Sequence, residues 1–425
     1  MKIETLRRSH LKRNIIIGVI AVLIISAITL NFTRAKYRVT QSIPLVNGTI
    51  NFELADLNAV AVYIQNGDDY SKSDTIPGSG YAFNKEKSYC TVSGEVDTSI
   101  ALSYDMNTQT LNVVPLTAKG TKCYLYFDTE PVPLREAILA NNEVNEGTPN
   151  FSNTTTTGMY ASADNLGTSY YFRGAVTNNY VLFAGYYWRI IRINGDGSIR
   201  IIYDGTSAYA NGESSADRQT GTSAYNSASG VYDTSVGVGY MYQTGAQRPS
   251  GQNSGTASTI KGVLDNWYAA NILGKGLDDK VVSTPGFCND REMASGYSWV
   301  SSGATFYYAT YDRLYGGQPT LQCINNNDLY TTKIGLITGD EVKFAGGLIG
   351  TNNTNYYLYT GQYYWTMSPF AFSSGRADMF SVNSFGALTY SNVYNASSVR
   401  PVLNLSFDVI ASGGDGTMNN PYVVA

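Results

Sequence analysis

The stretch that most limits the fold of this chain is residues 363–405, with the sequence YYWTMSPFAFSSGRADMFSVNSFGALTYSNVYNASSVRPVLNL. Aromatic and β-branched residues alternate there with Ser, Gly and Asn every few positions, which is typical of short strands joined by tight turns. The segment VRPVLNL reads as a closing strand whose Pro401 lies at an edge or a bulge, because proline cannot donate to a sheet. We therefore expect the apolar residues inside a sheet and the Tyr, Asn, Ser and Arg residues outside it.

The motif W-x-x-S-P at residues 365–369, followed some thirty residues later by V-R-P-V-L-x-L, resembles the end of an uncharacterised family of bacterial surface domains. That family is commonly written W-L-R-S-P and G-V-R-P, and this chain departs from it at Met367 and Ser398. The family is similar to the C-type-lectin-like fold of formylglycine-generating enzymes and of binding proteins diversified by retroelements. The resemblance covers about residues 171–408 and implies a constant scaffold that carries variable loops.

Composition indicates a β-rich extracellular protein rather than a nucleic-acid binder. The chain has 425 residues, which is enough for two or three domains, and only 15% of them are charged, with a net charge of −4. There are 35 Tyr and 42 Gly, and no basic field exists to hold phosphates. We expect an α+β, β-rich fold and no nucleic-acid partner.

The N-terminus carries basic residues followed by an apolar run at residues 15–32, which would span roughly 27 Å as a helix. The positive-inside rule then predicts a cytoplasmic tail at residues 1–14, a transmembrane signal-anchor helix at residues 15–33, and an extracellular chain after Lys36. Cleavage and release form the alternative, although Thr33-Arg34-Ala35 is a poor cleavage site. The predicted localisation is a single-pass protein of the cell membrane with its bulk outside.

The rest of the chain divides into three predicted parts. Residues 36–130 read as a small β-sandwich stalk, residues 131–165 as a short helix and a polar linker, and residues 166–425 as the C-type-lectin-like binding domain. Asn194-Gly195-Asp196-Gly197 predicts a tight hairpin, whereas residues 206–258 are too polar to fill a core and predict a surface excursion.

Two further helices are expected in the last part. One begins near Ser258, with Ile260, Val263, Leu264, Trp267 and Asn271 along one side. The other begins near Thr338, where Glu341 can complete a capping box and Asp340 complements the helix N-terminus.

Four cysteines, Cys90, Cys123, Cys288 and Cys323, all follow the predicted anchor and so lie in an oxidising compartment. Three connectivities are open. We favour Cys90 with Cys123 and Cys288 with Cys323, because each pair then lies inside one predicted domain. A metal site is the alternative, but no C-x-x-C spacing or nearby histidine supports it.

Candidate ligand-binding residues come from the aromatic and arginine side chains of residues 363–405. Such side chains give a large contact area at a low entropy cost. The set is Tyr363, Tyr364, Arg376, Tyr390 and Tyr394, with a buried role in the sheet as the alternative for each. Loops at residues 370–376 and 385–395 are expected to hold this chemistry.

Catalytic and metal chemistry find little support in the sequence. The single histidine, His10, falls in the predicted tail, which removes histidine bases and histidine metal sites from the outer domains. We predict no metal, no cofactor and no enzymatic activity. The predicted function is recognition of a glycan or protein ligand at the cell surface, with a structural spacer or a carbohydrate-active enzyme using Asp340, Glu341 or Asp378 as alternatives.

Overall fold

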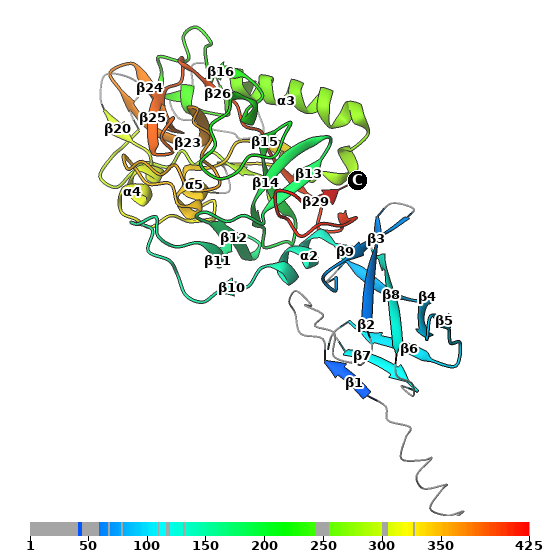
Figure 1. Ribbon diagram of the computed structural model, residues 1–425. Coiled ribbons are helices and arrows are strands. Elements are labelled where there is room, and N and C mark those ends of the chain that lie inside the picture. Colours follow the sequence, from blue (N-terminus) through cyan, green and yellow to red (C-terminus); the bar gives the residue numbers. More distant parts are fainter. Residues whose placement is uncertain are drawn as a thin grey trace, which may run out of the picture. The chain divides into compact units, whose positions relative to one another are not determined.

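The computed structural model describes residues 41–44, 59–66, 69–77, 80–106, 108, 110–115, 120–130, 132–243, 255–299, 305–325 and 328–424. The chain forms two compact units, Met1–Glu130 and Pro131–Ala425, hereafter unit 1 and unit 2 (Figure 1). The predicted tail and membrane segment, residues 1–33, lie outside the described residues. Within the described ranges, no helix is both long and apolar enough to cross a membrane.

Unit 1 contains two β-sheets, in agreement with the predicted sandwich. A three-stranded sheet has the order β1-β7-β6, and a five-stranded sheet has the order β3-β2-β8-β4-β5. The strands are β1 (Gln41–Pro44), β2 (Ala59–Asn66), β3 (Asp69–Ser73), β4 (Tyr81–Val92), β5 (Glu95–Val96), β6 (Ala101–Asp105), β7 (Thr110–Val114) and β8 (Thr121–Thr129).

The core of unit 1 draws on both sheets. Leu102 and Leu111 from the smaller sheet join Leu125 and Phe127 of β8 in one buried cluster. The Cys90–Cys123 disulfide links β4 and β8 at positions directly opposite each other, so this predicted pairing is confirmed. Unit 1 therefore has a core and a covalent link of its own.

Unit 2 is built on a sheet with eleven described strands (Figure 1). These strands are β9 (Val132–Pro133), β10 (Val144–Asn145), β11 (Gly158–Asp164), β12 (Gly167–Arg173), β13 (Tyr180–Phe183), β14 (Tyr186–Ile193), β15 (Ile199–Gly205), β22 (Ile334–Gly335), β27 (Val402–Leu405), β28 (Ile410–Ala411) and β29 (Tyr422–Val424). β29, red in Figure 1, pairs in parallel with β13, green, so the end of the chain lies beside the start of the unit.

A second sheet of unit 2 has the order β16-β26-β23-β24-β25, with β20 paired to β23. Its strands are β16 (Thr222–Ala224), β20 (Phe306–Tyr307), β23 (Tyr364–Ser373), β24 (Arg376–Val382), β25 (Leu388–Asn392) and β26 (Ala396–Ser398). Two small pairs are β17 (Met241–Tyr242) with β18 (Thr256–Ala257), and β19 (Phe287–Cys288) with β21 (Leu329–Tyr330).

The α-helices of unit 2 are α2 (Leu134–Asn141), α3 (Thr259–Asn271), α4 (Ala309–Tyr315) and α5 (Gly339–Ala345). Short 3-10 helices are η1 (Ala216–Arg218), η2 (Ser235–Val238), η3 (Leu273–Lys275) and η4 (Asp278–Lys280). Because the strands far outnumber the helices, the predicted β-rich α+β composition is confirmed.

The predicted β14–β15 hairpin is confirmed, and its strands lie at the centre of unit 2. β27 pairs with both β15 and β22, so VRPVLNL ends in an interior strand, and Pro401 immediately precedes that strand. Every residue of β15 is buried. Arg400 is 1% exposed and its Nη2 donates to Asp204, so the expectation that the arginines of this region lie outside is wrong for Arg400, whereas Arg376 is exposed as expected.

Two predictions about polar stretches are corrected by the structure. Residues 206–258 do not form a simple surface excursion, because Tyr225, Val238 and Tyr240 are fully buried in the main core. Tyrosine supplies there the apolar area that the stretch otherwise lacks. The predicted linker also belongs to unit 2, since Phe151 packs on Phe344 with ring centroids 4.8 Å apart and β11 lies in the large sheet.

The predicted helices are present with one change of face. Ser258 caps α3 by accepting from the amide of Lys261, and the full capping box of Thr338 and Glu341 begins α5. The buried side of α3 is formed by Ile260, Leu264 and Tyr268, whereas Val263 is 37% exposed. The prediction placed Val263 on the buried side, whereas the buried residue at this point of the helix is its neighbour Leu264.

Candidate functional site

Six aromatic side chains form a continuous group on unit 2, which we call the aromatic patch. Its members are Tyr297, Tyr307, Tyr311, Tyr315, Phe370 and Tyr390. Tyr311 lies between Tyr307 and Tyr315, with ring centroids 4.2 and 4.4 Å away. Tyr390 stacks on Phe370 at 3.9 Å with an angle of 8° between the rings. Phe370 also lies 5.8 Å from Tyr311, which joins the two halves of the patch.

Local structure explains why these rings meet. Tyr311 and Tyr315 are four residues apart on α4, so they project from the same side of the helix. Tyr307 lies on β20, opposite Ala371 of β23, which places it beside Phe370. Tyr390 on β25 is paired with Phe380 of β24, whose ring lies 5.1 Å from Phe370. The patch is therefore assembled from one helix, three strands and the irregular segment that carries Tyr297.

The patch is open to solvent at three of its rings. Tyr297 is 41% exposed, Tyr315 is 51% exposed and Tyr390 is 45% exposed, whereas Phe370, on which Tyr390 stacks, is buried. Partial burial raises the pKa of Tyr315, and the neighbouring hydroxyls of Tyr311 and Tyr390 raise it further. The patch contains no acidic or basic residue, and it presents aromatic faces with hydroxyl groups among them.

Arg313 holds helix α4 in place through two ion pairs. Its Nη1 lies 2.7 Å from Asp290 Oδ2, and its Nη2 lies 3.0 Å from Asp340 Oδ2 at the start of α5. Burial alone would lower the pKa of Arg313, but Asp340 and Asp290 outweigh burial and raise the pKa above its ordinary value. Leu314 anchors the same helix in the core. The surface tyrosines of α4 therefore belong to a helix that a buried ion cluster holds in place.

A second ion cluster continues from the first. Glu341 Oε1 lies 3.1 Å from Arg192 Nε and 2.9 Å from Arg200 Nε, and Arg192 also binds Asp164 at 2.9 Å. Burial raises the pKa of Glu341, but the two arginines outweigh burial and hold the pKa below its ordinary value. At Arg200 burial dominates and lowers the pKa to about 10. Both groups are charged at neutral pH.

The two clusters enclose a small cavity of about 40 Å³. The Cys288–Cys323 disulfide, which confirms the second predicted pairing, forms part of its wall together with Asp164 and Ser368. The cavity is large enough for ordered water but not for a sugar or a peptide. Within the described ranges, no group of three or more His, Cys, Asp or Glu side chains is arranged to hold a metal ion.

The structure brings one predicted ligand-binding residue, Tyr390, into the patch. Arg376 begins the neighbouring strand β24, is exposed, and donates from Nε to Asp378 Oδ1 at 2.8 Å. Tyr394 is 57% exposed and packs on Tyr232, with ring centroids 4.8 Å apart. Arg376 and Tyr394 thus border the sheet on which Tyr390 lies, but neither makes a recorded contact with the six rings.

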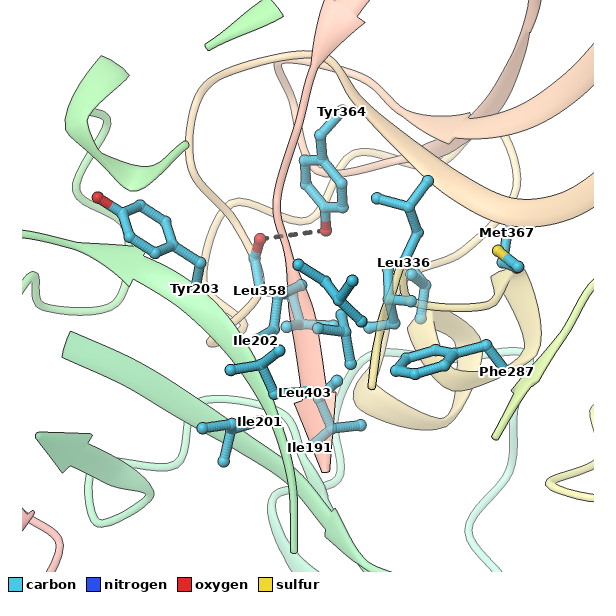
Figure 2. Packing of buried hydrophobic residues seen from close by; sticks show 14 of the residues in the cluster. Ile191, Ile201, Ile202, Tyr203, Phe287, Leu336, Leu358, Tyr364, Met367 and Leu403 are labelled. Atoms are coloured by element: carbon cyan, nitrogen blue, oxygen red, sulfur yellow. Dashed lines mark hydrogen bonds between the residues drawn. The ribbon is translucent and has the colours of Figure 1, made fainter. Parts of the chain in front are cut away.

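Two predicted residues lie elsewhere. Tyr364 is fully buried, and its hydroxyl donates to the carbonyl of Leu358 inside the core (Figure 2), so its assignment to a contact surface is wrong. The physical reason is that β23 is buried on both faces, from Tyr364 to Phe372, so no side chain of this stretch reaches the surface. Tyr363 is 49% exposed but precedes β23, about 20 Å along the chain from Phe370.

The predicted loops are also shorter than expected. Residues 370–373 belong to β23 and Arg376 to β24, which leaves only Ser374 and Gly375 as a turn, both with positive φ. In the second loop, residues 388–392 form β25. The contact surface is therefore a sheet face with an adjacent helix rather than a set of loops.

Sequence reasoning missed Tyr297, Tyr307, Tyr311 and Tyr315. A signal existed for two of them, because Tyr311 and Tyr315 are four residues apart, which is the spacing of one helix face, whereas Tyr307 lies on the preceding strand β20. Nothing local links Tyr297 to them, since it joins the patch through a ring contact with Tyr307 at 5.4 Å.

Comparison with known proteins adds no relative. No family model, curated protein or solved structure matches the chain. The candidate site therefore has to be interpreted from its own chemistry.

Proposed function

We propose that this chain is a membrane-anchored cell-surface protein whose unit 2 is a C-type-lectin-like domain that binds a glycan through the aromatic patch. The observation that carries the proposal is the patch itself, in which three tyrosines are between 41% and 51% exposed and each packs on another ring of the patch. Aromatic side chains held in this way give contact area at a low entropy cost, because they are already fixed by their neighbours.

The chemistry of the patch favours a glycan over a protein as the ligand. Its six side chains carry no charge, and their hydroxyls offer donors and acceptors beside apolar ring faces. A protein partner usually needs about 800 Å² on each side and a desolvated central pocket. Three exposed tyrosines with adjoining rings better suit the apolar face and hydroxyl rim of a sugar.

Placement at the cell surface is supported by the two disulfides, since such bonds persist in oxidising compartments. The anchor itself is proposed from the basic and apolar pattern of residues 1–33. In this arrangement unit 1 holds unit 2 away from the membrane.

The test is a glycan array probed with the full-length chain, followed by titration calorimetry with the best ligand. The triple variant Tyr297→Ala/Tyr315→Ala/Tyr390→Ala should weaken binding at least tenfold, because each ring contact contributes roughly 0.5 to 1.5 kcal/mol. The melting temperature should change little, since all three side chains are already half exposed.

Tyr363→Ala is the matched control, because Tyr363 is equally exposed but lies at the other end of β23. It should bind as the wild type does. If the array finds no glycan, or if Tyr363→Ala weakens binding as much as the triple variant, the aromatic patch is not the glycan site and a structural spacer role becomes the better account.

A further inference from the structure

The five-stranded sheet of unit 1 carries a second group of tyrosines, on the side away from the core. β8 alternates strictly, with Cys123, Leu125 and Phe127 buried and Tyr124 and Tyr126 facing outwards. The partners on either side obey the same rule, because Tyr126 is paired with Tyr63 of β2 and Tyr124 with Tyr89 of β4. We call the outward group, Tyr63, Tyr70, Tyr89, Tyr124 and Tyr126, the tyrosine row.

The rings of the row lie nearly parallel to their neighbours across the strands. Tyr63 stacks on Tyr126 at 4.9 Å with an angle of 12°, and Tyr89 stacks on Tyr124 at 4.8 Å with an angle of 18°. Tyr70 of β3 closes one end by an edge contact with Tyr126 at 5.1 Å. The row thus crosses four adjacent strands, a span of about 14 Å at the usual strand spacing.

Three lysines lie on the same side of the sheet as the tyrosine row. Lys122 Nζ lies 5.0 Å from the ring centre of Tyr124, and Lys87 Nζ lies 4.2 Å from that of Tyr70. Lys72 is paired with Tyr63 in register, so it points to the same side of the sheet. All three lysines are exposed. Such cation–π contacts hold the ammonium groups at the level of the rings.

The carboxylate at the end of the outward row of β8 is engaged. Asp128 accepts hydrogen bonds from the hydroxyl of Tyr70 and from Asn84 Nδ2, the second at 2.7 Å. The outward surface of the sheet therefore combines an aromatic row with three exposed ammonium groups. The carboxylate of Asp128 already has partners, and Glu86 is an exposed carboxylate next to Lys87 on β4.

We infer that the tyrosine row of unit 1 is a separate binding surface for an anionic polysaccharide, one that carries carboxylate groups along a linear chain. Sugar rings would stack on the tyrosines while acidic groups meet the lysines, so that one surface supplies both apolar contact and charge complementarity. This role differs from that of the aromatic patch, whose six members are all uncharged. Unit 1 would then be a second recognition module rather than a spacer.

A linear polymer suits the row better than a globular protein would. The row is a narrow line of rings rather than a broad area with a central anchor pocket of the kind that protein partners use. A polymer lying across four strands meets every ring in succession.

The experiment is affinity electrophoresis of the full-length chain in gels that contain polygalacturonate or, as a neutral probe with the same backbone, its full methyl ester. We expect polygalacturonate to retard the wild type, the ester to retard it less, and added salt to weaken the retardation. Lys87→Gln/Lys122→Gln should weaken retardation about tenfold, taking the two ammonium groups together. Both side chains are exposed, so folding is not at stake.

Lys85→Gln is the matched control, because Lys85 is an exposed lysine of β4 with no recorded contact to the row. It should leave retardation unchanged. Equal retardation by the ester, an equal effect of Lys85→Gln, or no retardation at all would overturn the inference. A change of oligomeric state in the double variant would overturn it in favour of self-association.

The aromatic-patch triple variant separates this inference from the proposed function. It should bind polygalacturonate as the wild type does, even where it has lost its array ligand. If it loses polygalacturonate binding as well, the anionic site lies on unit 2 and the assignment to the tyrosine row is wrong.

Discussion

Glu341→Gln is the sharpest perturbation of the buried ion cluster in unit 2. Glu341 is 2% exposed and lies between Arg192 and Arg200, at 3.1 and 2.9 Å. Glutamine has nearly the same shape and can also serve at the third position of a capping box, so the substitution removes charge and little else. Arg192 keeps Asp164, whereas Arg200 keeps only neutral partners such as the carbonyl of Gly286 at 3.0 Å.

The magnitude follows from which charge is left without a partner. Removing one member of a buried ion pair costs roughly 3 to 5 kcal/mol, because the other charge stays buried and uncompensated. We expect Glu341→Gln to lose this amount of unfolding free energy. Glu341→Ala should lose about 1 kcal/mol more, since it also removes the side-chain bond from Glu341 to the amide of Thr338 that completes the capping box of α5.

The assay is urea denaturation followed by tryptophan fluorescence. The chain has four tryptophans, Trp188, Trp267, Trp299 and Trp365, and all belong to unit 2, so the signal reports that unit alone. Asp265→Asn is the control, because Asp265 forms an exposed pair with Lys261 within α3 and should cost less than about 0.5 kcal/mol. If Glu341→Gln costs no more than this control, the cluster does not hold unit 2 together.

Three further outcomes are expected from the same measurement. Unit 2 should lose stability as the pH falls below about 4, because the folded-state pKa values of Asp164 and Glu341 lie below their ordinary values. Their stabilising contribution is present above the ordinary pKa values and disappears as the carboxylates protonate in the folded protein. Burial raises the pKa values of Asp328 and Asp378, which therefore act in the opposite direction at higher pH, and a stability profile that is flat from pH 5 to pH 3 would contradict this account. Cys288→Ser/Cys323→Ser should lower the stability of unit 2 by roughly 2 to 5 kcal/mol, while Cys90→Ser/Cys123→Ser should leave the tryptophan transition unchanged. Val402→Asp should prevent folding of unit 2, because residue 402 is fully buried between β15 and β22, and a native fluorescence spectrum for this variant would refute that expectation.

The elements that sequence patterns predicted well are those with local causes. The β14–β15 hairpin follows from Asn194-Gly195-Asp196-Gly197, where Gly197 takes a positive φ of 88°, and α5 follows from the reciprocal cap of Thr338 and Glu341. The disulfides were predictable because each pair lies within one unit. In these cases the residues that decide the structure are neighbours in sequence or share a domain.

The errors concern which side of a strand faces the core. Tyr363 and Tyr364 are adjacent and chemically identical, yet one is 49% exposed and the other fully buried. The difference comes from the start of β23, because Tyr363 precedes the strand whereas Tyr364 begins a stretch that is buried on both faces, and the sequence does not mark that boundary. The burial of Arg200 and Arg400 could not be predicted from local sequence either. Both are buried because Glu341 and Asp204, which come from distant segments, compensate their charges.

The link between the buried clusters and the aromatic patch can be tested without knowing any ligand. Asp290→Asn weakens one of the two ion pairs of Arg313 and leaves its two bonds to Asp340, at 3.1 and 3.0 Å, in place. We expect Asp290→Asn to lower the local stability of α4 by about 1.4 kcal/mol, which corresponds to tenfold faster amide hydrogen exchange in this helix.

Exchange in the β14–β15 hairpin should remain as in the wild type, because the pairs of Glu341 with Arg192 and Arg200 are untouched. The two tyrosines of α4 would then move with their helix while the sheet beneath stays fixed. Equal loss of protection in the hairpin and the helix would mean that Arg313 supports the whole unit, whereas unchanged exchange in α4 would mean that Leu314 and the capped α5 suffice to hold the patch.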